Sequence, residues 1–404
     1  MNTVSLRNVS RYTSRGISPK YVESDGLLVL NQKCIRNQKI DLGPARLTDS
    51  GKKFNDEKRL RKFDILINST GVGTLGRIAQ LKFDLDATVD SHVTIFRPAE
   101  MTPDGKSKLD PLYIGYSIRN QEKFIESLGA GATGQTELSK DSVLDGVVIQ
   151  LPDFKIQTNI GSVLSAYDDL IENNEKRIKI LEEMAERLYR EWFVNFKFPG
   201  HEKVKLVESG TEYGRIPEGW EVNKIEDISD FKMGQSPESK YYNSDGDGLP
   251  FHQGVSDFGD LIPTNRIYAT QGNKHAMLGD ILFSVRAPVG EINLCTEEIV
   301  IGRGVGAFRH KMNHQWFLLC ALKNRFTEKD LIGNGAIYKA VNKNEIQSLL
   351  FLSSPEKIEA AFNNLAGNFY EEIVNLFHQN AILSQTRDLL IPQLVTGRKE
   401  LQNL

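Results

Sequence analysis

Tyr167-Asp168-Asp169-Leu170-Ile171 is followed, 203 residues later, by Tyr370-Glu371-Glu372-Ile373-Val374. The same offset relates Pro152 to Pro355, so the two stretches belong to a longer repeat. A repeat of about 200 residues far exceeds the periods of solenoid proteins, which predicts two copies of a whole module. Two fused copies of one module in turn predict an internal two-fold axis.

Short apolar runs bounded by glycine and polar residues predict strands in both copies. The expected strands are residues 64–68, 93–96 and 147–151 in the first copy and residues 280–285, 299–301 and 348–352 in the second. Pro152 and Pro355 then close each β-rich region. Each module is therefore expected to combine a β-rich globular part with a long helix that follows the proline, which is an α+β fold.

A heptad pattern follows Pro152. Its apolar seam consists of Ile160, Leu164, Tyr167, Ile171, Asn174, Ile178, Leu181, Ala185, Leu188 and Trp192, at spacings that alternate four and three. A helix of about 33 residues is about 50 Å long, and such a seam normally packs against a partner helix.

The second copy supplies a matching helix with a less regular stripe. Its members are Ile358, Phe362, Leu365, Phe369, Ile373, Leu376, Asn380, Leu383, Leu390 and Leu394. We expect the two helices to pair within the chain, because an uncovered seam of this length would promote association. Asn174 and Asn380 lie in the seams, where a buried amide fixes register. A surface stripe packed on the globular parts is the alternative.

These patterns divide the chain into consecutive segments. We expect a globular domain at residues 1–153, a long helix at 154–199, a polar linker at 200–215, a second globular domain at 216–354 and a second long helix at 355–404. No apolar run reaches 18 residues and the start lacks the order of a signal peptide, so we expect a cytoplasmic protein without a membrane partner. Cys34, Cys295 and Cys320 are odd in number and far apart, which favours buried free thiols.

Basic residues are concentrated at the start of the chain. Residues 1–63 carry 14 Lys and Arg against 6 Asp and Glu, although the whole chain has a formal charge of -3. Clustered cations favour contact with nucleic-acid phosphates through counterion release, and a solvated charged loop is the alternative. The candidates are Arg36, Lys39, Lys52, Lys53, Lys58, Arg59, Arg61 and Lys62.

Gly71-Val72-Gly73-Thr74-Leu75-Gly76 matches the dinucleotide-binding pattern GxGxxG. A dinucleotide site also needs a long helix directly afterwards, and residues 77–84 do not predict one. The second copy has Val285-Arg286-Ala287-Pro288-Val289-Gly290 instead, which retains only the last glycine. We therefore expect a turn between strands that brings backbone close to a ligand such as DNA.

Polar residues near these turns and in the two loops at residues 131–140 and 333–343 are candidate DNA contacts, because arginine suits guanine and glutamine or asparagine suits adenine. The candidates are Ser69, Thr70, Arg77, Arg97, Gln135, Thr136, Lys140, Arg286, Arg303, Arg309, Tyr338, Lys339 and Lys343. Ordinary polar residues at strand ends are the alternative.

No catalytic residue is predicted. The chain contains no nucleophile elbow, P-loop or amino-methyltransferase motif. His310 and His314 stand four residues apart with Cys320 beyond, but the first copy has no equivalent and no glutamate lies between the histidines. We therefore expect no metal site.

Three segments resemble the specificity subunit of type I restriction-modification enzymes. The most specific is Asn174-Glu175-Lys176-Arg177-Ile178-Lys179-Ile180-Leu181-Glu182-Glu183-Met184-Ala185-Glu186-Arg187-Leu188-Tyr189-Arg190-Glu191-Trp192-Phe193, which is similar to the family's central helix. Ile216-Pro217-Glu218-Gly219-Trp220 is similar to the entry into its second recognition domain. Thr386-Arg387-Asp388-Leu389-Leu390-Ile391-Pro392, followed by Gly397, is similar to its distal helix. Together these segments extend the resemblance over the whole chain.

The resemblance implies two target recognition domains that read the two parts of an asymmetric double-stranded DNA sequence. Two long antiparallel coiled-coil helices would set the gap, with pseudo-two-fold symmetry. Two methyltransferase subunits would dock on the helical regions and modify adenine with S-adenosylmethionine, and nuclease-translocase subunits would add ATP- and Mg-dependent restriction. This chain would itself hold no cofactor. The alternatives are a stand-alone DNA-binding regulator that dimerises through its helices, and a structural adaptor for other proteins.

Overall fold

The computed structural model describes residues 2–51, 53–129, 137–327 and 340–399. The chain divides into two compact units. Unit 1 comprises Met1–Asn173 and Asn380–Leu404, and unit 2 comprises Asn174–Gln379. Helices α4 (Phe154–Tyr189) and α8 (Glu356–Val395) each contribute residues to both units, so the compact units differ from the consecutive segments expected from the sequence.

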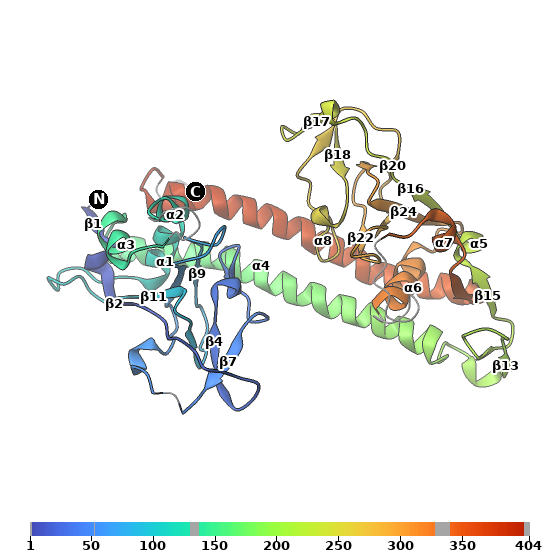
Figure 1. Cartoon of the computed structure of the whole chain (residues 1–404), viewed down its shortest axis with the longest axis horizontal. Coiled ribbons are helices and arrows are strands. Elements are labelled where there is room, and N and C mark those ends of the chain that lie inside the picture. The colour runs from blue at the N-terminus through green and yellow to red at the C-terminus, as the bar shows by residue number, and fades with distance from the viewer. Residues whose placement is uncertain (1, 52, 130–136, 328–339, 400–404) are drawn as a thin grey trace. The chain divides into compact units, whose positions relative to one another are not determined.

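Two sheets form the β-rich part of unit 1 (Figure 1). The first has the order β2 (Ser10–Arg15), β11 (Val93–Pro98), β8 (Ile65–Asn68), β9 (Ile78–Gln80), and all its neighbours are antiparallel. The second has the order β10 (Ala87–Val89), β4 (Gly26–Leu30), β7 (Arg46–Asp49), β3 (Tyr21–Val22). Residues of β8 alternate between two cores: Ile65 and Ile67 pack with the helices, whereas Leu66 packs toward β4 and β10. The first sheet is therefore buried on both faces.

Smaller elements complete unit 1. They are β1 (Asn2–Ser5) paired with β12 (Val148–Leu151), the hairpin β5 (Ile35–Arg36) with β6 (Lys39–Ile40), and the helices α1 (Pro111–Arg119), α2 (Glu122–Ser127) and α3 (Lys140–Gly146). Asp110 caps α1 by accepting a hydrogen bond from the backbone of Tyr113 at 2.8 Å, and Pro111 fits the first helical position.

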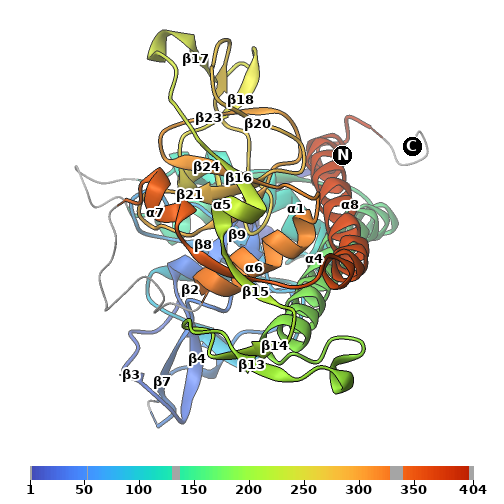
Figure 2. The same cartoon turned by 90° about the vertical axis from the view of Figure 1, so that its right-hand side faces the viewer.

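Unit 2 repeats the strand order of unit 1, with one additional strand in its second sheet. Its first sheet runs β16 (Ser229–Met233), β24 (Val305–His310), β21 (Ile281–Ser284), β22 (Ile292–Leu294). Its second runs β17 (Tyr242–Asn243), β19 (Tyr268–Ala269), β18 (Leu249–His252), β23 (Ile299–Ile301), β20 (His275–Ala276). The parallel pair β18 and β23 matches the parallel pair β4 and β10 of unit 1. Both views place β17, β18 and β20 on the opposite side of β16 and β24 from helix α6 (Gln315–Thr327) (Figures 1 and 2).

The remaining elements of unit 2 include two further strand pairs and two short helices. The pairs are β13 (Leu206–Glu208) with β14 (Arg215–Pro217) and β15 (Glu221–Lys224) with β25 (Leu350–Ser353), and the helices are α5 (Ile225–Ile228) and α7 (Lys343–Gln347). The hairpin of β13 and β14 occupies most of the region predicted as a linker. Val207 pairs with Ile216 in this hairpin. The polar composition of the segment predicted a linker and did not indicate this strand pair.

The two long helices run antiparallel within each unit. In unit 1, the side chain of Asn380 donates to the carbonyl of Ile171 at 3.3 Å, and Arg387 pairs with Asp168 at 2.7 Å. In unit 2, Asn174 donates to Gln379 at 3.5 Å, and Arg177 pairs with Glu372 at 2.6 Å. Within each unit the residue numbers fall along α8 as they rise along α4. The predicted helix pairing is confirmed, and both seam asparagines make polar contacts between the helices.

The predicted seam of α4 is the buried face of that helix. Ile160 and Leu164 belong to the core of unit 1, whereas Ile178, Ala185 and Trp192 belong to the core of unit 2. The following seam positions are also buried or half-buried: Tyr167, Ile171, Asn174, Leu181 and Leu188 of α4, and Asn380, Leu383 and Leu390 of α8. Leu365, which was predicted in the stripe of α8, is exposed instead. All three cysteines are buried free thiols, as expected.

No helix among the described residues combines the length and apolar character needed to cross a membrane.

Candidate nucleic-acid interface

In each unit, the glycine turns lie together at one end of the strands of the first sheet. Because neighbouring strands are antiparallel, β2 and β8 end where β11 and β9 begin. The loops that meet there in unit 1 are residues 16–20, 69–77 and 90–92. The equivalent loops in unit 2 are residues 234–238, 285–291 and 302–304. We call this end of each sheet the glycine edge of its unit.

The loop at residues 69–77 is a turn between β8 and β9, as the sequence predicted. Gly71, Gly73 and Gly76 all have positive φ angles, of 105°, 71° and 78°, which favour glycine. A Cβ atom at Gly76 would lie 2.7 Å from the Cα atom of Glu126. Arg77 folds back and donates to the carbonyl of Gly73 at 2.7 Å. A strand follows this turn where a dinucleotide site requires a helix.

The matching turn of unit 2 is held by different groups. Ser284 donates its hydroxyl hydrogen to the carbonyl of Pro288 at 2.7 Å and accepts from the backbone of Glu291 at 2.8 Å. Arg286 is exposed on this turn, and its backbone bridges to Ala340. In unit 1, Thr70 bridges to Glu137 in the same way. In both units the chain thus returns to the glycine edge, at Glu137 in unit 1 and at Ala340 in unit 2.

Two predicted DNA contacts lie at the opposite end of the sheets. Arg97 is buried, and its guanidinium makes two hydrogen bonds of 2.8 Å to the carboxylate of Asp64. Arg309 pairs with Asp280 at 2.6 Å. Each aspartate begins the strand next to the one that carries the arginine, so the repeat preserves a cross-strand ion pair. The prediction that Arg97 contacts DNA is corrected, because its charge is buried and neutralised within the unit.

Several cations of the basic first third are also engaged within unit 1. Lys58 donates to the carbonyl of Gly16 at 2.7 Å, Arg59 pairs with Asp86 at 2.5 Å, and Arg61 pairs with Glu57 at 3.0 Å. Arg36, Lys39, Lys53 and Lys62 are exposed, and the ammonium of Lys62 lies 5.3 Å from the ring centre of Phe63. The exposed members retain the chemistry expected of phosphate contacts. Lys52 lies outside the described residues.

The remaining predicted contacts fall into four groups. Ser69 is buried and shares a 2.5 Å hydrogen bond with Thr94, so its prediction as a DNA contact is also corrected. Thr70 bonds to the ring of His92 at 2.7 Å. Lys140, Lys343 and Arg303 are exposed. Gln135, Thr136, Tyr338 and Lys339 lie outside the described residues.

The sequence reading missed two exposed residues on the glycine edges. His92 begins the return into β11, and Gln253 follows β18 beside Gly304, whose backbone donates to the carbonyl of Gln253 at 3.0 Å. The repeat contained a signal for His92, because His92 lies two residues before Thr94-Ile95-Phe96-Arg97, which matches Gly306-Ala307-Phe308-Arg309 of the second copy. Gln253 lies in a stretch where the two copies diverge in sequence.

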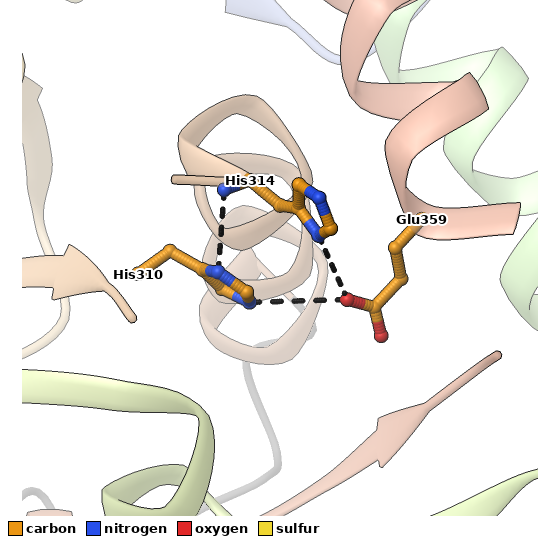
Figure 3. Close-up of side chains that lie close together, drawn as sticks. All are labelled: His310, His314 and Glu359. Carbon is orange, nitrogen blue, oxygen red and sulfur yellow. Dashed lines mark hydrogen bonds and ion pairs between the residues drawn. The ribbon is translucent and has the colours of Figure 1, made fainter. Parts of the chain in front are cut away.

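His310, His314 and Glu359 lie close together in unit 2 (Figure 3), with one potential ligand atom of each within 4.8 Å of the others. Nδ1 of His310 accepts hydrogen bonds from the backbones of Met312 and His314, at 3.1 and 3.2 Å. The proton of the neutral ring is therefore on Nε2, the atom that faces Glu359. A metal at Nε2 would displace that proton while both backbone donors still point at Nδ1, so the arrangement opposes metal binding.

The side chains of His310, His314 and Glu359 instead connect the end of β24, the residue before α6 and the start of α8. Glu359, in the first turns of α8, shares a 3.3 Å hydrogen bond with His314 and accepts from the backbone of Ser354 at 3.1 Å. Burial lowers the pKa of His310 to about 4, which keeps its ring neutral near pH 7. Cys320 is buried against Tyr370 elsewhere in the core.

Sequence and structure comparisons identify related proteins. The family described as "Type I restriction modification DNA specificity domain" matches residues 22–183 and 217–351. A Methanocaldococcus jannaschii protein, provisionally named the MjaX specificity subunit of a type I restriction enzyme, is 32% identical over 250 residues, which cover 60% of this chain and 57% of that protein. The chain thus spans little more than half the length of this relative.

Two further relatives match almost end to end. The specificity subunit of the type I restriction enzyme HindI of Haemophilus influenzae is 22% identical, and the alignment covers 97% of each chain. The crystal structure of a type I restriction-modification system S subunit from M. genitalium is 16% identical, with a TM-score of 0.60, and covers 98% of this chain and 96% of that one. The latter match supports the fold. Because the family match spans well over half of the sequence, this chain belongs to the type I restriction modification DNA specificity domain family.

Proposed function

We propose that this chain is the DNA sequence-specificity subunit of a type I restriction-modification system. It recognises a bipartite, asymmetric DNA sequence with a fixed gap and directs partner methyltransferase and restriction subunits to that sequence. The observation that carries this proposal is the duplicated glycine edge, which has the same strand order in both units but different side chains. One backbone design with two sets of exposed groups is suited to reading two different half-sites.

The exposed cations would position the DNA. Arg36, Lys39, Lys53 and Lys62 of unit 1 would contact phosphates, which gives affinity without sequence information. Groups on the glycine edges would read bases: Thr70, His92 and Arg77 in unit 1, and Arg286 and Arg303 in unit 2. Lys140 and Lys343 begin helices that follow the return to each edge, where they would add positive charge.

The helices would bind the partner subunits. The seam residues other than Leu365 are buried or half-buried and largely inaccessible to a partner. Leu365 and several apolar side chains outside the seams remain exposed on the helices, namely Leu170, Ile180 and Met184 of α4 and Ile382 and Leu389 of α8. Exposed apolar residues on long helices favour contact with another protein. In this proposal two methyltransferase subunits hold S-adenosylmethionine, restriction subunits use ATP and Mg, and this chain contributes no catalytic group.

Methylome sequencing tests the proposal. Cells that express this chain with its methyltransferase partner are compared with cells that express the methyltransferase alone. We expect adenine methylation at a new two-part motif with a constant gap only when the chain is present. An active methyltransferase that gains no new motif from this chain would contradict the proposal.

A further inference from the structure

Arg303 occupies the tip of a firmly held turn on the glycine edge of unit 2. The backbone of Gly302 donates to the carbonyl of His252 at 2.8 Å, and that of Gly304 donates to Gln253 at 3.0 Å. The backbone of Arg303 itself donates to the hydroxyl of Ser236 at 3.2 Å. Hydrogen bonds on both sides of the tip therefore fix the point from which the arginine side chain projects.

Close packing requires a glycine at position 304 and leaves little room for a side chain at position 302. A Cβ atom at Gly304 would lie 2.3 Å from the carbonyl oxygen of Gln253, and one at Gly302 would lie 3.0 Å from the Cα atom of the same residue. The side chain of Arg303 is exposed, and among residues 137–327 and 340–399 its guanidinium has no hydrogen-bond or ion-pair partner. The turn thus combines a rigid backbone with a free planar donor group.

Unit 1 has the same turn with different chemistry. Val89 pairs with Leu30 as Ile301 pairs with His252, and the backbone of Asp90 donates to Leu30 at 2.9 Å as that of Gly302 does to His252. This register places Ser91 at the position of Arg303. It also places Asn31 at the position of Gln253.

Asn31 is engaged within its own loop, because its side chain accepts from the backbone of Lys33 at 2.8 Å and donates to Pro44 at 2.7 Å. The side chain of Gln253 is exposed instead. Unit 2 therefore presents an arginine beside a glutamine, where unit 1 presents a serine beside an occupied asparagine. The two glycine edges have different capacities for reading bases.

From this difference we propose that Arg303 is a specificity-determining residue, which reads the guanine of a G·C pair in the major groove of the half-site contacted by unit 2. The inference rests on the proposed function and adds the base that one residue reads. A guanidinium can donate two parallel, coplanar hydrogen bonds to O6 and N7 of guanine, whereas a lysine ammonium reaches the same atoms without this planar fork. A rigid mounting favours this bidentate geometry, whereas a phosphate contact needs only a nearby positive charge.

The experiment uses the purified complex of this chain with its methyltransferase. Methylation rates are measured on a duplex that carries the wild-type motif and on duplexes with each base pair of both half-sites replaced in turn. The half-site of unit 2 is the one that persists when residues 1–153 are exchanged for those of a relative. Arg303→Lys and Arg303→Ala are compared with Arg215→Lys, a control at an exposed arginine on β14 of the same unit.

We expect Arg303→Ala to lose discrimination at one G·C pair of the unit 2 half-site by roughly 5- to 150-fold, and Arg303→Lys to lose no more than Arg303→Ala at the same pair. Discrimination at the other half-site and in the control variant should be unchanged. Equal slowing on all duplexes, retained discrimination in Arg303→Ala, or relaxation in the unit 1 half-site would each overturn the inference while the proposed function stands. A wild-type complex that methylates no bipartite duplex would instead refute the proposed function itself.

Discussion

Replacing Arg97 by methionine should destabilise unit 1 far more than replacing Arg309 by methionine destabilises unit 2. The side chain of Arg97 is 6% exposed and that of Asp64 is fully buried. Besides its two bonds to Asp64, Arg97 donates to Glu57 and to the carbonyl of Arg59, each at 2.8 Å. Removal of the arginine leaves a buried carboxylate without its countercharge, which costs about 3–5 kcal/mol.

Arg309 provides a matched control at the equivalent position. Its side chain is 46% exposed, and within the described part of the chain it donates to Asp280 and to the carbonyl of Leu278. Asp280 is itself only 6% exposed, so the loss of Arg309 also leaves a buried carboxylate, but solvent reaches the guanidinium and screens the pair. The loss should therefore cost less than that of Arg97, about 1–2 kcal/mol. The free-energy differences can be read from hydrogen exchange of backbone amides in β8 and β11, compared with β21 and β24, because each unit then reports on its own opening.

If Arg97→Met accelerates exchange in unit 1 no more than Arg309→Met does in unit 2, the buried ion pair does not stabilise the first sheet as argued. The double variant Asp64→Asn/Arg97→Met removes the uncompensated charge, so its cost should fall below that of Arg97→Met alone. Unchanged exchange in all three variants would return Arg97 to the set of candidate DNA contacts.

Two other predictions concern spacing and pH. Inserting one heptad after Asn173 in α4 and one after Gln379 in α8 adds about 10.5 Å to each helix. The gap between the half-sites should therefore grow by about 3 base pairs of roughly 3.4 Å each. If methylome sequencing finds the gap unchanged, the helices do not set it. Burial lowers the pKa of His310 to about 4 from about 6.5 in the unfolded chain, so unit 2 should lose up to about 3 kcal/mol of stability as pH falls from 6.5 toward 4, and none of this effect should appear above that range. His310→Asn keeps an acceptor for the same backbone donors but cannot titrate in this range. Chemical denaturation should therefore show a free energy of unfolding that depends less on pH in this variant. An unaltered pH dependence would show that His310 does not cause it.

The long helices could be predicted from the sequence because heptad spacing directly reflects burial. Ile171, Ile178 and Trp192 were each placed in the seam by spacing, and all three are buried. The division into compact units could not be predicted in this way, since a consecutive reading cannot show that one helix contributes to two cores. Asn173 and Gln379 end stretches of different units although nothing in their local sequence marks a boundary.

The candidate site was only partly predictable for a similar reason. The glycine turns were recognised, because their spacing and the repeat both indicate a turn. Arg97 was predicted to contact DNA, but the antiparallel register of β11 and β8 brings it opposite Asp64. That register cannot be deduced from the positions of charged residues in the sequence alone. The repeat contained a clue, since Asp64 and Asp280 recur together with Arg97 and Arg309. Gln253 was missed because its exposure follows from the neighbouring turn at Gly304.

Exchange of residues 1–153 for the corresponding residues of another family member tests the central claim most directly. The exchanged chain is expressed with the original methyltransferase, and its methylome is compared with that of the parent. If the two units read separate half-sites, one half of the methylated motif should change, while the other half and the gap stay the same. A motif that changes in both halves, or in neither, would contradict the claim that each unit reads its own part of the DNA sequence.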